Sequence, residues 1–92
     1  MEKDSNKIFT VMLKLIGHAE PILEQMGNQE ALTTANELRS SIVTYLYLRK
    51  QSEENPDITI QLQSLAQAVE LLPLIESKTI EFNEILAKIR EA

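Results

Sequence analysis

His18 is the single histidine of the 92-residue chain and the side chain best suited to proton or phosphoryl transfer near neutral pH. Such a role needs an exposed imidazole with an orienting neighbour, and Gly17 and Glu20 supply only a weak form of that pattern. A metal site of the di-iron bundle type would need a Glu three residues from the histidine, where this chain has Leu15 and Pro21. We expect His18 to be an ordinary polar residue, no metal site and no cofactor, with a small phosphotransfer or regulatory protein as the alternative.

Several carboxylates stand close together at near-helical spacing, namely Glu20 and Glu24, Glu70 and Glu76, and Glu81 and Glu84. Acid–base catalysis needs such a pair in a dry pocket, but these residues fall outside the apolar stripes described below. No glycine-rich phosphate loop and no recognisable nucleophile–histidine order is present. We expect a solvated acidic face, no catalytic residues and no enzymatic activity. An acidic mimic of nucleic acid is the alternative reading of residues 53–92.

The composition is typical of a folded helical domain, with 43% apolar residues, 25% charged residues and a net charge of −5. Residues 53–92 carry eight acidic and three basic side chains, and the nine Lys and Arg are scattered, so direct binding to nucleic acid is not expected. Without cysteine there is no disulfide framework. No apolar run approaches the roughly 18 to 20 residues of a membrane span. We expect a single cytoplasmic domain, residues 1–92, with no membrane contact.

The first predicted helix follows the N-cap candidates Asp4 and Ser5 and ends at Gly27, with Asn28 capping the next helix. Its apolar residues recur at alternating spacings of four and three, which predicts one buried stripe. The stripe comprises Ile8, Met12, Leu15, Ala19, Ile22 and Met26, and is widened by Phe9, Ile16 and Leu23. Pro21 predicts a kink, with a complete break and restart as the alternative.

Two further helices are predicted, and the short turn at Gly27 makes the second run antiparallel to the first. The second helix places Ala31, Ala35, Leu38, Ile42, Tyr45 and Arg49 on one stripe. The third is expected to use Asn55 as its cap and Pro56 as its first residue. Its stripe comprises Ile58, Leu62, Leu65, Ala68, Leu72, Ile75, Thr79, Phe82, Leu86 and Ile89.

Pro73 decides between two architectures. The surrounding Leu71, Leu72, Leu74 and Ile75 are aliphatic, and the segment lacks the Gly, Asn or Asp that turns favour. We therefore predict an all-α fold, an antiparallel three-helix bundle with a long last helix kinked at Pro73. The alternative is a four-helix bundle with a turn at Pro73.

The run from Ile42 to Leu48 is apolar in nearly every direction around its helix, which exceeds what one partner helix covers. The surplus predicts an interaction surface. Its expected anchors are Ile42, Val43, Leu46, Tyr47, Leu71 and Leu74. We expect a non-enzymatic interaction module that forms a homodimer through the second and last helices and docks an unidentified protein partner. Small helical adaptors, chaperones, immunity proteins and inhibitors have this size and shape, although fold alone does not determine function.

Overall fold

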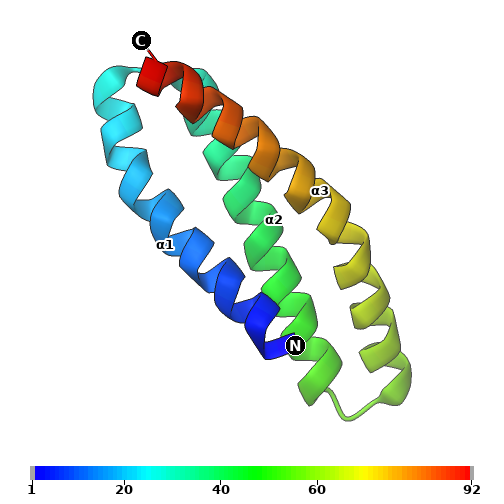
Figure 1. The fold of residues 1–92 in the computed structure, drawn as a ribbon. Coiled ribbons are helices and arrows are strands. Elements are labelled where there is room, and N and C mark those ends of the chain that lie inside the picture. Colours follow the sequence, from blue (N-terminus) through cyan, green and yellow to red (C-terminus); the bar gives the residue numbers. More distant parts are fainter. Residues whose placement is uncertain (1, 92) are drawn as a thin grey trace.

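The structure is a computed structural model that describes the backbone of residues 2–91 and the side chains of residues 6–91. It contains three helices, α1 (Glu2–Met26), α2 (Gln29–Glu54) and α3 (Ile58–Glu91), and no strand within the described backbone (Figure 1). The prediction of an all-α fold is confirmed.

Helix α2 lies between the other two (Figure 1). Both α1 and α3 run antiparallel to α2, so they run parallel to each other. Within the described backbone no Cα atom of α1 comes within 8 Å of a Cα atom of α3. The molecule is elongated, with extents of 51 × 22 × 20 Å. The two outer helices are therefore held together through α2 rather than by direct backbone packing.

The two connections differ in how well the sequence predicts them. Gly27 has φ 69°, the left-handed conformation that ends a helix, and the side chain of Asn28 accepts a hydrogen bond from the N–H of Ala31 at 3.0 Å. Both were expected. The cap of α3 was placed wrongly, because Asp57 rather than Asn55 accepts from the N–H of Thr59, at 2.8 Å. Asn55 instead accepts from the N–H of Asp57 and ends α2.

Both internal prolines lie inside continuous helices, since α1 runs through Pro21 and α3 through Pro73. The break at Pro21 and the turn at Pro73 are therefore wrong, and the four-helix alternative falls with them. Each proline costs one backbone hydrogen bond. Burial of Leu23 and Ile75 just beyond the two prolines, each 3% exposed, offsets that loss by keeping the same face of each helix packed.

The core forms along α2, whose predicted stripe is entirely buried, from Ala31 to Arg49. Helix α1 packs on it through Ile16 and Leu23. The rings of Phe9 and Tyr45 meet edge to face, with centroids 4.9 Å apart. The α3 contribution is Ala68, Ile75, Phe82 and Ile85, with the small buried Ser64 one helical turn earlier.

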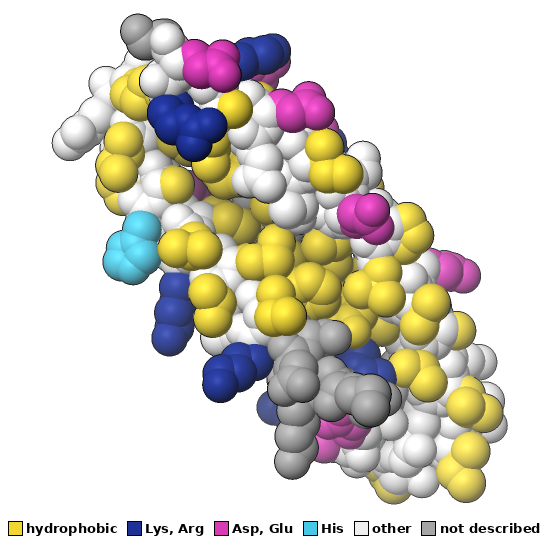
Figure 2. All heavy atoms as spheres, in the orientation of Figure 1, with side chains coloured by type: hydrophobic (Ala, Val, Ile, Leu, Met, Phe, Trp, Pro, Cys, Tyr) yellow, Lys and Arg dark blue, Asp and Glu magenta, His cyan; other side chains and the backbone are white. Residues whose placement is uncertain are grey.

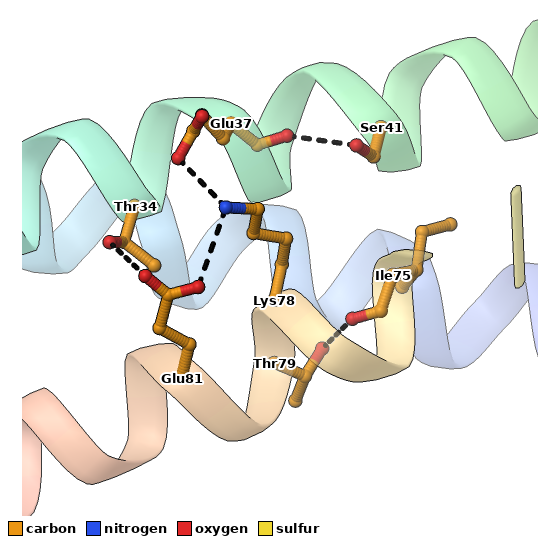
Figure 3. A network of polar contacts seen from close by, with 7 residues as sticks. All are labelled: Thr34, Glu37, Ser41, Ile75, Lys78, Thr79 and Glu81. Atoms are coloured by element: carbon orange, nitrogen blue, oxygen red, sulfur yellow. Dashed lines mark hydrogen bonds and ion pairs between the residues drawn. The ribbon is translucent and has the colours of Figure 1, made fainter. Parts of the chain in front are cut away.

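A polar network fixes α3 against α2 (Figure 3). The Lys78 ammonium donates to Glu37 of α2 at 3.1 Å and to Glu81 of α3 at 3.4 Å. Thr34 of α2 donates to the other oxygen of Glu81 at 3.5 Å. Hydrogen bonding to Glu37, supported by Glu81, raises the pKa of Lys78 above its ordinary value of about 10.5. On the other side of α2, Arg39 forms an ion pair with Glu20 of α1.

Candidate binding surface

His18 is exposed on α1, and no hydrogen bond or ion pair joins it to another side chain in residues 6–91. Its neighbour Glu20 is held by Arg39 of α2 instead. The described residues also contain no group of three His, Cys, Asp or Glu placed to hold a metal ion. Within residues 6–91, no side chain therefore orients the imidazole in this structure.

The structure does not bring the six predicted anchors together. Ile42 is fully buried in the core, so its assignment to an exposed surface is wrong. The physical reason is that Ile42 lies on the same stripe as Leu38 and Tyr45, which packs against both outer helices. Leu46 and Leu71 are half-buried against this core.

The other three anchors, Val43, Tyr47 and Leu74, are exposed. At about 100° per residue, Tyr47 points about 180° and Val43 about 140° away from Leu38 around α2. Leu74 points about 160° away from Leu72 around α3. Because Leu38 and Leu72 line the groove described next, these exposed anchors face away from it.

An apolar groove separates α1 from α3, with α2 as its floor (Figure 2). Its larger part encloses about 420 Å³ and is continued by a second part of about 330 Å³, the two sharing Met12 and Thr79. We call this the α1–α3 groove. It is lined by Phe9, Met12, Leu15, Ile16 and Ala19 of α1, Leu38 of α2, and Leu72, Ile75, Glu76, Thr79, Ile80, Phe82, Asn83 and Leu86 of α3. Thr79 donates to the carbonyl of Ile75, so its hydroxyl is satisfied within α3.

Beside the groove, α1 exposes a line of residues that the sequence assigned to the core, and the middle member of this line, Leu15, lines the groove. Ile8, Leu15 and Ile22 recur every seven residues and drift by only about 20° per interval, so they form one line along α1. Each is about 60% exposed: 59%, 62% and 59%. The adjacent line of Phe9, Ile16 and Leu23, expected to be secondary, is the one that packs on α2. The predicted stripe of α1 is therefore wrong in part. Its Met12 and Ala19 pack against the core, whereas its other members are exposed, namely Ile8, Leu15, Ile22 and Met26.

The α3 wall continues toward the start of the helix as a second exposed stripe. Four residues lie within about 80° of Leu72 around the axis of α3, namely Ile58, Leu62, Leu65 and Val69. All five are exposed, although the sequence placed four of them on the buried stripe. Of that stripe, Ala68, Ile75 and Phe82 are buried as predicted.

We define the apolar face as the groove together with these two exposed stripes, including Val11 and Met26, which point within about 40° of Leu15 around α1. Large exposed apolar side chains gather there over the described part of the chain, and Figure 2 shows hydrophobic side chains between α1 and α3 and along α3. Its exposed members are Ile8, Val11, Leu15, Ile22 and Met26 of α1, and Ile58, Leu62, Leu65, Val69, Leu72 and Ile80 of α3. Only Val43, Tyr47, Ile60 and Leu74 are comparably exposed elsewhere in the described residues.

Helix α3 is also long and apolar enough, by length and composition alone, to cross a membrane, contrary to the expectation from the sequence. An 18-residue window reaches a mean hydropathy of 1.3, and only 17% of that window is buried in the molecule. One such helix is weak support for a membrane span. Most of the large exposed apolar side chains in the described residues also belong to α3.

The sequence contained a signal for this surface that the periodicity argument did not use. Helix α1 carries two adjacent apolar lines, and one partner helix can bury only one of them. The line left over lies beside the groove, whereas the run from Ile42 to Leu48 is covered only in part, since Val43 and Tyr47 stay exposed. Comparison with known protein families, curated proteins and solved structures finds no match to this chain.

Proposed function

We propose that this chain is a non-enzymatic protein–protein interaction module that self-associates and docks a protein partner through an apolar helix face. The observation that carries the proposal is the α1–α3 groove, an apolar channel open along two parallel helices. An amphipathic helix recognised by such a groove presents apolar anchors at spacings of three, four and seven residues. The occupant would complete the layer that α1 and α3 leave open over α2.

The extent of the exposed apolar surface supports this role. Among described residues, more large apolar side chains are exposed than are fully buried. Soluble monomers rarely expose contiguous apolar patches of more than a few hundred Å². A protein partner accounts for this surface better than a bilayer does. The apolar half of α3 also contains four polar side chains, namely Gln61, Gln63, Gln67 and Glu70. Each would lose its hydration in the hydrocarbon core of a membrane, which is unfavourable.

The scaffold of the proposed module is an antiparallel three-helix bundle in which α3 bends at Pro73. Pro73 has no N–H to donate to the carbonyl of Val69, so the helix lacks one restraint at this point. A bend there would let the first half of α3 follow an occupant of the groove while the second half stays fixed by Lys78.

Affinity capture from a cytoplasmic extract of the native host tests the proposal. The baits are three forms of the chain: the wild type, a groove variant and a control variant. The groove variant is the double substitution Leu15→Glu with Leu72→Glu, and the control is Val43→Glu with Tyr47→Glu, which alters comparably exposed residues outside the apolar face. We expect the wild type and the control to capture the same protein and the groove variant to lose it. Equal capture by a folded groove variant, checked by circular dichroism, would remove the groove from the function.

A further inference from the structure

The accessible surface of the molecule is larger than that of a compact monomer of the same mass. Its accessible surface is 6409 Å², whereas a compact monomer of 10.5 kDa exposes about 5,400 Å². The radius of gyration is 15.1 Å, against about 12 Å for a compact domain of this length. The excess of about 1,000 Å² is close to the roughly 800 Å² that each partner contributes to a standard interface. One interface of ordinary size would therefore bring this chain to the surface expected of a compact domain.

We propose that the apolar face is covered by a second copy of this chain in a two-fold dimer, with α1 of each copy lying against α3 of the other. A two-fold interface joins the same patch on both copies, and here that patch holds two parallel helices. If the symmetry axis runs parallel to the helices, α1 packs against the partner's α3. Residues at the same position along the helix axes then face each other. If the axis runs across them, α1 meets α1 and α3 meets α3.

Charge selects the first arrangement. Between residues 6 and 19 the charged side chains of α1 are Lys7 and Lys14, both exposed. Between residues 66 and 87 the only cation of α3 is Lys78, which is already held by Glu37 and Glu81. Packing α3 on α3 would bring the glutamates of two copies together, whereas packing α1 on α3 brings Lys7 and Lys14 to a helix rich in glutamate.

The heights match as well. Glu76 lines the groove together with Phe9 and Met12, so it lies level with the part of α1 between Lys7 and Lys14. In the proposed dimer Glu76 of each copy therefore comes within the range of two flexible lysine side chains of the other. The net charge of −5 on each chain opposes association overall, but separations beyond about 8 Å are screened at physiological salt.

This inference rests on the proposed function, because the second copy occupies the same face that docks a protein partner. The dimer is then the resting form, and a partner helix binds by displacing the second copy. Dimerisation and capture remain separate measurements, so each can fail without the other.

Disulfide cross-linking tests the arrangement directly, because the chain has no cysteine of its own. Val11→Cys and Ile80→Cys place thiols at matching heights of α1 and α3, since Met12 and Ile80 line the same part of the groove. Each variant carries a single cysteine, so no disulfide can form within one chain.

Differently tagged Val11→Cys and Ile80→Cys chains, mixed and oxidised, are expected to form a mixed disulfide dimer. Val43→Cys, about half exposed outside the face, is the control and should stay uncross-linked. Self-linking of Val11→Cys without the mixed species would overturn the α1-on-α3 arrangement. Equal cross-linking of Val43→Cys would overturn the choice of face.

Sedimentation equilibrium at high micromolar concentration provides the second readout. We expect the wild type at twice 10.5 kDa and the Leu15→Glu, Leu72→Glu variant to dissociate at least about tenfold more readily. A monomeric wild type overturns the dimer, and groove-dependent capture in the same preparation would leave the proposed function standing. A groove variant that both dimerises and captures like the wild type overturns both proposals.

Discussion

Ile42 and Val43 are neighbours in α2, yet Ile42 is fully buried and Val43 is 49% exposed. We expect Ile42→Ala to lower the free energy of unfolding by about 2–5 kcal/mol, because it leaves a cavity where α2 meets the outer helices. Val43→Ala should lower it by less than about 1 kcal/mol. Urea unfolding followed by circular dichroism measures both, and similar losses would contradict the placement of Ile42 in the core.

At the scale of elements, Lys78 links the unfolding of α2 and α3 to pH. Its pKa is higher in the folded chain, so the folded state holds this proton more tightly than the unfolded state. The resulting stabilisation is complete below about pH 10.5 and is lost as the pH rises through the folded pKa. We expect the stability difference between wild type and Lys78→Gln to be constant from about pH 7 to pH 10 and to shrink above that range.

Urea unfolding of both proteins across this range checks the expectation. Lys50→Gln is the matched control, because Lys50 is exposed on α2 and is joined to no other side chain in residues 6–91. Its difference from the wild type at about pH 7 to 10 should be smaller than that of Lys78→Gln, because no hydrogen bond between helices is lost. A Lys78→Gln difference that stays constant into strong alkali would show that the network does not stabilise the fold.

At the scale of the whole molecule, association couples stability to concentration. A chain that is folded as a dimer melts at a Tm that rises with total protein, by mass action. We expect this rise for the wild type and for Val43→Glu with Tyr47→Glu, and a nearly constant Tm for Leu15→Glu with Leu72→Glu. Thermal unfolding over about a hundredfold range of concentration measures it. A wild-type Tm independent of concentration would contradict a dimeric folded state.

The sequence predicted α2 better than its neighbours, for a physical reason. One stripe of α2, from Ala31 to Arg49, is made of apolar residues and the long Arg49 side chain. The other faces of the first half of this helix are polar, so only one orientation of α2 buries its apolar residues. Helix α1 offers two adjacent apolar lines, and periodicity alone cannot rank them. The choice is made by tertiary contacts, such as the Phe9–Tyr45 ring pair and the ion pair between Glu20 and Arg39.

The candidate site was less predictable than the fold, because the groove is created by the distance between two helices. That distance is not encoded in the residue pattern of either helix. The sequence placed an apolar surplus at Ile42 and its neighbours, but α2 uses Ile42 as core. Leu15 and Leu72 were assigned to the core and instead line the open groove. The separation of α1 from α3 leaves Leu15 and Leu72 exposed, and the sequence pattern alone does not show this separation.

The central position of α2 also determines how the molecule opens. Because α1 has no close backbone approach to α3, it can detach while the α2–α3 hairpin stays folded. Amide hydrogens of α1 would exchange with solvent through this partial opening, whereas those along the seam between α2 and α3 require global unfolding. Detachment of α1 also removes one wall of the groove, so a single local fluctuation controls both amide protection and the availability of the docking surface.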